Sequence, residues 1–440
     1  MAREMIIGMH FGNGYGSQPG AWRMSGIDPT SYTNLDNQVR YAQAAERGKF
    51  QFLFVPDFPA LKGDIEAEAP QITIDPMMTL AAVARETKRI GLVATGTATF
   101  NEPYGLARQF KALDLMSHGR AGWNAVPTSD PAIAANYGRE LPSRAEKYER
   151  LHESIQIVQA LWGSWERDAW LHDTTSGRFA DPGKIQPINL RGRHVGSRGP
   201  LPIPPSEQGQ PVIFQAGGGD YGLEVAGRYA SGVIGATFTI DDAREHRNDL
   251  RAAAERNGRD PDEIKFFAGL MTTIAPDKRT GLDRRIALSG QTFPQRASYL
   301  GQMLGLLIDP ARLDTPLSQE QLEAARPSRN DPRSDHALKI ARDGWTVGDI
   351  LAHGIIDYHP VIAGPAIEVA DHMQEWFEAG AVDGFWLSPD VYEDGIDAFV
   401  DNVVPILQER GLFHRDYEGS TLREHLGAPA QYGLDPRIIR

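Results

Sequence analysis

A glycine-rich run is the clearest chemical signal in this sequence. Residues 217–222 read Gly-Gly-Gly-Asp-Tyr-Gly and separate a short apolar stretch from a helical pattern. Glycines let backbone N–H groups approach a phosphate at a helix N-terminus, which makes Gly218 and Gly219 candidate phosphate ligands. The run also fits G-x-G-x-x-G, with Asp241 and Asp242 following about twenty residues on, as in dinucleotide-binding folds. A strand-to-helix turn without any ligand is the alternative.

Few other residues have the spacing of a hydrolase site. A glycosidase needs a close pair of carboxyl groups, and no acid accompanies Asn124 in the fourth apolar run, although Asp57 ends the second. A metallohydrolase needs two histidines two residues apart, yet His10 stands between Met9 and Phe11. We therefore predict no metal site. His10 is either a packed histidine or part of an active site.

Eight short apolar runs, each followed by a stretch with helical spacing, organise the chain. The runs are Met5–Phe11, Phe50–Pro56, Ile90–Phe100, Ala121–Val126, Pro211–Ala216, Gly232–Phe238, Lys265–Ala275 and Val382–Ser388. Helical patterns include Leu35–Arg47, Pro76–Lys88, Pro103–Met116, Ser143–Trp165, Asp241–Asn257, Ile367–Ala379 and Ile396–Arg410. Strict alternation predicts parallel strands, and eight such units close a barrel.

The predicted fold is therefore α/β, a single (β/α)8 TIM barrel spanning residues 1–440. This order weakens the dinucleotide hypothesis, because a doubly wound sheet places its glycine fingerprint near the beginning, whereas four units precede residues 217–222. His10 and Asp57 fall at the ends of barrel strands, where such enzymes place their chemistry.

The spacing breaks in one place, between the seventh strand and the helix that should follow it. The insertion covers about residues 276–365, where a barrel needs only a short loop. It contains a charged, proline-bearing stretch at 326–335 and an apolar stretch at 299–308, so part of it should be ordered. Because it leaves from the C-terminal end of a barrel strand, we expect a lid over the active site, with a plain surface excursion as the alternative.

Composition excludes several classes of partner. The chain has 45 basic and 58 acidic residues, a net charge of −13, which disfavours nucleic acids and anionic membranes. It has no cysteine and therefore no disulfide or thiolate nucleophile. The N-terminus lacks a cleavable signal, and no segment reaches the roughly 20 apolar residues of a membrane span. We expect a cytoplasmic protein.

Several motifs together resemble one known family. The most specific is residues 117–124, Ser-His-Gly-Arg-Ala-Gly-Trp-Asn; others lie at 91–100, 102–108, 211–217 and 417–427. On these residues, and over nearly its whole length, the chain is similar to the bacterial-luciferase-like flavin-dependent monooxygenases. The resemblance is to the branch with nitrilotriacetate, dibenzothiophene-sulfone and long-chain-alkane monooxygenases.

This resemblance implies an FMN-dependent monooxygenase, an oxidoreductase of class EC 1.14. It implies the oxygenase component of a two-component system, in which a separate NAD(P)H:flavin reductase supplies reduced FMN by diffusion and O2 is the co-substrate. A flavin C4a-(hydro)peroxide would then oxidise a small organic substrate. A homo-oligomer, dimer or tetramer, is also expected. The alternatives are a deazaflavin- or flavin-dependent reductase on the same fold and a non-catalytic flavin-binding barrel.

The resemblance also assigns roles to residues. The positions that match family contacts to flavin are Asp57, Thr97, Asn124, Arg144, Tyr148, Gly218 and Gly219. Relatives usually have His at position 144 and Ser at 219, but an arginine can meet a phosphate bidentately and Gly219 keeps its backbone N–H. Tyr148 follows Arg144 by one helical turn, so both can share a face.

Catalytic and substrate residues are predicted less directly. His10 is a candidate for a catalytic role because it lies at the end of a barrel strand, and Asn124, on a strand next to the flavin contacts that the resemblance implies, is a second candidate. Trp22, in the loop after the first strand, is the candidate for the substrate pocket. Trp123 and Trp386 are expected in the core.

Overall fold

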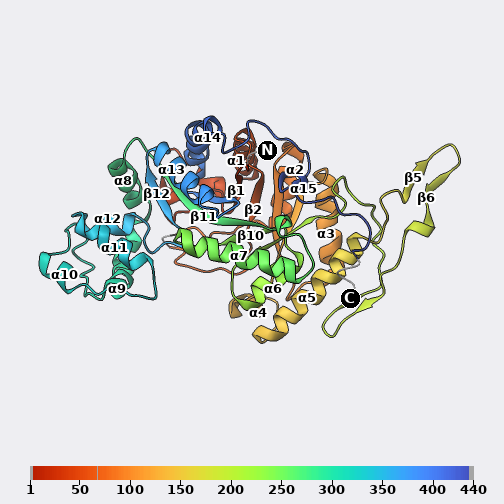
Figure 1. The fold of residues 1–440 in the computed structure, drawn as a ribbon, viewed down its shortest axis with the longest axis horizontal. Coiled ribbons are helices and arrows are strands. Elements are labelled where there is room, and N and C mark those ends of the chain that lie inside the picture. Colours follow the sequence, from red (N-terminus) through yellow and green to blue (C-terminus); the bar gives the residue numbers. More distant parts are fainter. Residues whose placement is uncertain (1–2, 67, 436–440) are drawn as a thin grey trace.

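Eight parallel strands close into a barrel in the computed structural model of the chain, which describes residues 3–66 and 68–435 (Figure 1). The barrel strands are β1 (Ile6–His10), β2 (Phe52–Val55), β3 (Gly91–Thr97), β4 (Ala121–Val126), β9 (Val212–Ala216), β10 (Gly232–Gly235), β11 (Lys265–Ile274) and β13 (Gly384–Pro389). Each pairs in parallel with its neighbours, and the pairing of β10 with β11 completes the ring. The predicted barrel and its eight strands are confirmed, and the doubly wound alternative is wrong.

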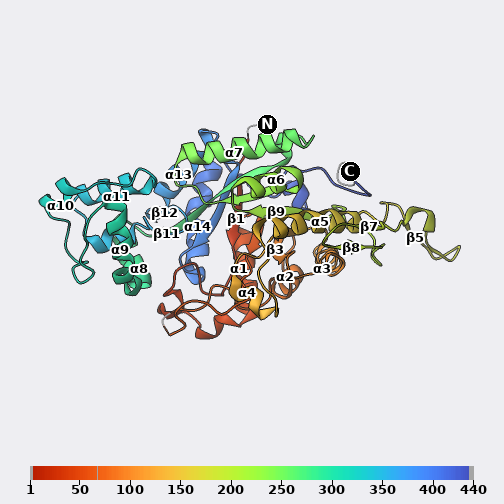
Figure 2. The same ribbon diagram turned by 90° about the horizontal axis from the view of Figure 1, so that it is seen from below.

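One long helix follows each barrel strand. These helices are α1 (Leu35–Arg47), α2 (Pro76–Glu86), α3 (Pro103–Met116), α5 (Arg144–Trp162), α6 (Asp220–Tyr229), α7 (Ile240–Arg256), α13 (Ala366–Glu378) and α14 (Tyr392–Glu409). Figure 2 shows α6 and α7 on one side of the strands and α1, α2 and α3 on the other. Local chemistry sets their ends: Ser143 and Glu146 form a capping box at the start of α5, and Gly163 ends it.

Aromatic side chains fill the barrel interior on the side away from the C-terminal ends of the strands. The ring of Phe52 lies 5.1 Å from those of both Phe214 and Phe267, centroid to centroid. Gly8 makes room for this packing, because a Cβ there would lie 2.2 Å from the Phe52 ring. The interior is therefore a packed core at this level, and a ligand has room only nearer the C-terminal ends of the strands.

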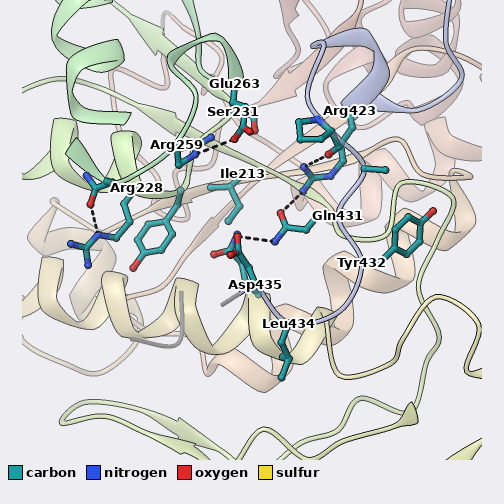
Figure 3. Close-up of a pocket in the computed structure, with 15 residues that line it drawn as sticks. Ile213, Arg228, Ser231, Arg259, Glu263, Arg423, Gln431, Tyr432, Leu434 and Asp435 are labelled. Carbon is teal, nitrogen blue, oxygen red and sulfur yellow. Dashed lines mark hydrogen bonds and ion pairs between the residues drawn. The ribbon is translucent and has the colours of Figure 1, made fainter. Parts of the chain in front are cut away.

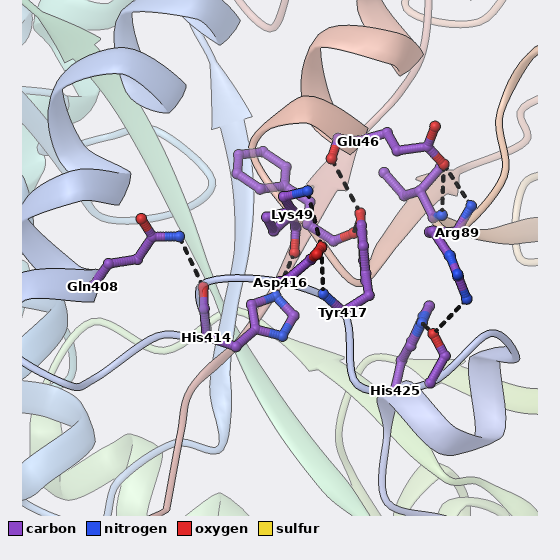
Figure 4. Close-up of polar contacts among 11 residues, drawn as sticks. Glu46, Lys49, Arg89, Gln408, His414, Asp416, Tyr417 and His425 are labelled. Carbon is purple, nitrogen blue, oxygen red and sulfur yellow. Dashed lines mark hydrogen bonds and ion pairs between the residues drawn. The ribbon is translucent and has the colours of Figure 1, made fainter.

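The C-terminal segment closes the opposite end of the barrel. The short helix α15 (Leu422–His425) inserts Leu422 beneath the strands, where Leu422 joins the interior cluster with Val93 and Val212. Polar contacts hold the preceding residues in place (Figure 4): the Tyr417 hydroxyl donates to the carbonyl oxygen of Phe50 at 2.6 Å. We call α15 with Leu422 the plug of the barrel. Through it, residues 417–427 pack against the barrel strands although they lie near the end of the sequence.

Removing the plug's side chain should destabilise the barrel. Leu422 is fully buried, so Leu422→Ala should lower the free energy of unfolding by about 2–5 kcal/mol through lost burial and a new cavity. Urea unfolding followed by circular dichroism measures this. The control is Leu307→Ala, at a side chain 96% exposed, which should change stability by no more than about 0.5 kcal/mol. Equal losses in the two variants would show that α15 does not support the barrel.

The predicted insertion is folded and has a core of its own. It contains α8 (Lys278–Ser289), α9 (Phe293–Leu304), α10 (Gln319–Ala324), α11 (Arg333–Arg342), α12 (Val347–Ala352) and β12 (Val361–Gly364). Buried residues such as Leu300, Ile350 and Leu351 form a cluster separate from the barrel core. β12 extends the sheet by pairing with the last residues of β11, Met271–Ile274. The insertion lies at one end of the molecule's long axis (Figure 1).

The prediction of a single break in the spacing is wrong. A second excursion leaves the barrel between α5 and β9 and carries two hairpins, β5 (Trp170–Asp173) with β6 (Arg178–Ala180) and β7 (Leu190–Arg191) with β8 (Gly196–Ser197). These strands are short and exposed, so they lack the apolar runs that mark the barrel strands. The hairpin of β5 and β6 projects at the end opposite the insertion (Figure 1).

Candidate functional site

A cavity of about 330 Å³ opens at the C-terminal ends of β2, β3 and β4. It is lined by Asp57, Thr95 and Thr97 and by the loop of residues 126–130 that follows β4. Two of the predicted flavin residues, Asp57 and Thr97, are thereby brought together. The hydroxyls of Thr97 and Thr128 lie 2.7 Å apart and tie this loop to the end of β3.

Asn124 lies on the barrel-interior side of the same strands. Its side-chain amide donates to the Thr95 hydroxyl at 2.8 Å, which fixes the orientation of the side chain. The carbonyl oxygen Oδ1 is buried and has no hydrogen-bond partner among the described residues. A buried acceptor without a partner is costly, so this atom is positioned to accept a hydrogen bond from a ligand.

Asp57 has an unusual ionisation equilibrium. Burial, followed by the nearby negative charge of Asp75, raises its pKa to about 6. Near neutral pH the carboxyl group is therefore mostly ionised but keeps a minor protonated population, so it can accept or, when protonated, donate a hydrogen bond. A ligand that donates to it would favour the carboxylate.

The glycine run forms the loop between β9 and α6. Gly217 and Gly219 adopt positive φ angles of 108° and 86°, which only glycine takes readily. Gly219 is the N-cap of α6 and has no side chain to satisfy the first N–H groups of that helix. A Cβ on Gly219 would lie 3.4 Å from the guanidinium of Arg144, and one on Gly218 would lie 3.6 Å from His246. The loop thus combines exposed N–H groups with a neighbouring positive charge.

Arg144 and Tyr148 meet the glycine loop through Tyr221. The guanidinium of Arg144 lies 5.1 Å from the centre of the Tyr221 ring, and Tyr148 stacks on that ring at 5.0 Å. Both side chains leave the same face of α5, as predicted. The structure therefore brings Arg144, Tyr148 and Gly219 together.

Lys147 connects α5, the helix of Arg144 and Tyr148, to the loop that follows β4 and lines the cavity. The sequence analysis did not predict this residue as part of the site. It lies on α5 between Arg144 and Tyr148, and its ammonium group donates to Ser129 Oγ at 2.8 Å and to the carbonyl of Thr128 at 3.2 Å. Burial, and then the charge of Arg144, lower its pKa. A lysine near a helix start has no distinctive sequence signal, because most such lysines face solvent.

His10 is buried inside the barrel at the C-terminal end of β1, across the mouth from the cavity lined by Asp57. Its Nδ1 is 2.7 Å from the Tyr392 hydroxyl, which also lies 3.1 Å from the carbonyl oxygen of His10. Burial lowers the pKa of His10 to about 4, so the imidazole is neutral at physiological pH. Trp386 packs edge-on against it at 5.4 Å. The sequence could not pair His10 with Tyr392, which is 382 residues away.

A second histidine, His359, enters the same region from the insertion. Its ring contacts Trp386 at 5.4 Å and is 3% exposed. Gly269 permits this approach, because a Cβ there would lie 2.1 Å from His359 Nδ1. Burial, and then the charge of His10, lower its pKa to about 4. Both ring nitrogens of His359, and Nε1 of Trp386, have no hydrogen-bond partner within the described ranges.

Trp22 lies apart from the other predicted residues. It lines a cavity of about 400 Å³ with Tyr15, Tyr32 and residues of the loop after β2. None of the other predicted site residues lines that cavity. Its predicted contact with substrate therefore depends on a ligand that extends beyond the cavity at Asp57.

The cavity in Figure 3 is not part of this site. It measures about 460 Å³ and is lined near the N-terminal ends of the strands by Ile213, Ser231 and Arg423, with none of the predicted residues. Its arginines contact other protein groups: Arg423 donates to the carbonyl of Gln210 at 2.9 Å, and Arg228 to Asn257 at 3.0 Å. Such satisfied side chains indicate a structural role.

Residues 3–66 and 68–435 hold no cluster of three or more His, Cys, Asp or Glu suited to a metal ion. In the same ranges, no helix has both the length and the apolar character required to cross a bilayer.

Comparison with protein families identifies this arrangement. Residues 9–383 match the profile of the family described as luciferase-like monooxygenase, which is most of the chain. The chain belongs to the luciferase-like monooxygenase family. The resemblance found in the sequence motifs is therefore confirmed, and a flavin is supported as the cofactor of this monooxygenase.

Relatives match over almost the full length of the luciferase-like monooxygenase. The N-acetyl-S-(2-succino)cysteine monooxygenase of Bacillus subtilis (strain 168) is 36% identical over 424 residues, 94% of each chain. Nitrilotriacetate monooxygenase component A of Aminobacter aminovorans is 34% identical over 438 residues, 96% of this chain and 94% of the relative. A riboflavin lyase, solved with modified FMN and riboflavin, superposes with a TM-score of 0.78 at 29% identity, covering 97% and 96% of the two chains.

Proposed function

We propose that this luciferase-like monooxygenase binds reduced FMN, delivered by a separate NAD(P)H:flavin reductase, and uses O2 to oxidise a small organic substrate. The observation that carries the proposal is the set of polar groups without partners at the barrel mouth, beside a glycine loop and an arginine. These groups are buried and have no hydrogen-bond partner among the described residues, so a ligand can supply one: Asn124 Oδ1, Trp386 Nε1 and the ring nitrogens of His359. A flavin offers both the ring-edge donors and acceptors and the phosphate that such a site requires.

The residues present fit the phosphate end of FMN. We assign the phosphate to the N–H groups of Gly218 and Gly219, at the positive end of the α6 dipole, and to Arg144. Arg144 lies close enough to the loop to contact the same group, and Tyr148 supports it through Tyr221. The arginine at position 144 thus replaces the histidine of relatives with a permanent positive charge.

The residues at the cavity fit the ring end. We assign Asp57, Thr97 and Asn124 to the polar edge of the isoalloxazine, because Asp57 and Thr97 line one cavity and Asn124 is fixed through Thr95. Reduced flavin, when held by these residues, would supply the electrons that activate O2. Asp57, with a pKa of about 6, can adjust its proton to the donor or acceptor it meets.

His10 and His359 are proposed to serve the reacting region as neutral hydrogen-bonding groups. Because the Tyr392 hydroxyl engages Nδ1 of His10, we assign Nε2 to the contact with the ligand. His359 can donate from one ring nitrogen and accept at the other. Because burial keeps both pKa values near 4, neither ring adds a positive charge to an apolar pocket.

We propose that the insertion, residues 276–365, acts as a lid. It contributes His359 to the mouth, and Arg333 of α11 packs on Phe238, in the loop after β10, at 4.6 Å. A closed mouth would exclude water from the activated oxygen, which is the main requirement of such chemistry.

Isotope labelling tests the proposed function. The protein is mixed with chemically reduced FMN, ¹⁸O2 and a panel of small organic molecules, and products are analysed by mass spectrometry. We expect a product that contains one ¹⁸O atom, and none when oxidised FMN replaces reduced FMN. Reduction of a substrate without oxygen uptake would favour the reductase alternative. Flavin binding with neither oxygen uptake nor product would favour a non-catalytic barrel.

A further inference from the structure

One tryptophan of the barrel interior has a polar group without a partner. Trp386, the third residue of β13, is 9% exposed, and the rings of His10 and Phe54 pack against it at 5.4 and 5.6 Å. An indole N–H can only donate, yet Nε1 of Trp386 meets no acceptor within the described part of the chain. The buried indoles of Trp123 and Trp162, by contrast, both donate to backbone carbonyls at 2.9 Å. The unpaired donor therefore indicates a ligand that accepts a hydrogen bond.

His359 is held against Trp386 by its neighbours in the sequence. Two positions earlier, the buried carboxylate of Asp357 forms ion pairs with two arginines of the insertion. On the other side, the carbonyl of Pro360 accepts a hydrogen bond of 2.9 Å from the backbone of β11. The imidazole is thus presented in one position, although it is almost fully buried and neither of its nitrogens has a partner in the described ranges. Such preorganisation lowers the entropy cost of binding a ligand.

The two rings together offer two donors that the protein does not use. A neutral imidazole carries one N–H group, and the indole carries another. The ring centroids of His359 and Trp386 lie 5.4 Å apart, so both groups belong to one small region. An oxygen atom has lone pairs for two donors, whereas an apolar ligand group would leave both donors unpaired at a cost in free energy. The region therefore favours a ligand oxygen.

Charge decides which kind of oxygen fits. Three arginines pair with three carboxylates that are close in the sequence to the two rings: Arg285 and Arg296 with Asp357, and Arg284 with Asp390 and Asp394. Their charges cancel, and burial keeps the pKa values of His10 and His359 at about 4, so both imidazoles are neutral. An anionic oxygen would lose its water here without gaining a cation from these rings, which is costly. An uncharged oxygen loses much less.

We propose that the indole N–H of Trp386 and the imidazole N–H of His359 hold an uncharged acceptor oxygen of the organic substrate, such as that of a sulfone, sulfoxide, ketone or amide. The flavin ring is assigned to other residues, Asp57, Thr97 and Asn124, which leaves these two donors for the second ligand. They determine specificity by excluding a carboxylate or sulfonate at the same position. The identification of this ligand as the substrate rests on the proposed monooxygenase function, whereas the binding preference does not.

Matched pairs of small probes test the preference. The full chain without flavin is dialysed to equilibrium with methyl phenyl sulfone or benzenesulfonate, and with acetophenone or benzoate. Each pair keeps the phenyl ring and differs in the charge on the oxygen-bearing group. The uncharged probe of each pair should bind about tenfold more tightly or better, because burying an unpaired charge is penalised. Equal or tighter binding of the anions, or no binding of either uncharged probe at millimolar concentrations, would overturn the proposal.

Substitutions that keep a ring but remove an N–H group test the two residues. Trp386→Phe and His359→Phe should each weaken binding of the uncharged probes about three- to tenfold, the usual effect of one lost hydrogen bond. His359→Gln keeps a donor and should recover part of the loss. The control is Trp376→Phe, at a buried tryptophan of α13 in the outer core, which should leave the affinities unchanged. Unchanged affinities in both ring variants, or an equal loss in Trp376→Phe, would overturn the assignment.

Two further measurements keep the outcomes separate. If one ring variant does not fold, the other decides, and the comparison of probe pairs on the unchanged protein needs no variant. Anaerobic titration of the unchanged protein with reduced FMN tests the proposed function independently. Failure to bind FMN would overturn that function and leave the probe preference standing. Normal FMN binding together with a preference for the anions would overturn only the present inference.

Discussion

Product formation should fall to background when the flavin reductase is left out of the reaction, even with NADH, FMN and O2 all present. The physical reason is that the glycine run is a loop of a barrel and not the first turn of a dinucleotide-binding sheet. Asp241, which would hold a ribose in that fold, is exposed at the start of α7 and pairs with Arg244 at 2.7 Å. The described residues therefore do not assemble the pyrophosphate and ribose contacts of a dinucleotide-binding fold. NADH consumption and product are measured with and without an added reductase.

Thermal protection provides the matching control. FMN should raise the melting temperature, because it binds the folded state, whereas NADH at the same concentration should have little effect. Asp241→Ala should change neither result. Rapid NADH oxidation by the chain alone, or protection by NADH that Asp241→Ala abolishes, would contradict the two-component function.

Arg144→Ala should weaken FMN binding by about 10- to 100-fold and riboflavin binding much less. A charge-assisted contact to phosphate is worth on the order of 1.5–3 kcal/mol, and riboflavin has no phosphate. The Arg144 guanidinium lies 3.4 Å from the position that a Cβ on Gly219 would take, beside the first residue of α6. Anaerobic titration of both reduced ligands measures the two losses.

Two further variants test whether the effect is specific to the position and to the guanidinium group. Arg108→Ala removes an exposed arginine of α3 and should leave both affinities unchanged. Arg144→Lys keeps the charge but not the fork geometry, so its affinity for FMN should fall between those of the other two. Equal losses of FMN and riboflavin with Arg144→Ala would place Arg144 away from the phosphate.

Local periodicity was sufficient to predict the barrel. Strands buried on both faces must be almost continuously apolar, and the helices that cover them must be amphipathic, so each unit carries its own signal. The predicted span Leu35–Arg47 is the observed α1, and Ala121–Val126 is the observed β4. The same signal is missing from β5 and β6, which are exposed, so the sequence pattern does not indicate the second excursion.

The contacts at the site also fall into two groups, those that the sequence predicts and those that depend on tertiary packing. Arg144 and Tyr148 could be placed together from the sequence because one helical turn separates them, and the barrel order brought the loop of Gly219 to the same end of the strands. The contacts of His10 with Tyr392, of His359 with Trp386, and of Lys147 with the loop after β4 depend on how separate elements pack. The sequence alone thus determined the elements and the end of the barrel that carries the chemistry. Only the tertiary structure decided which side chains meet there, because such meetings depend on long-range packing, which leaves no period in the chain.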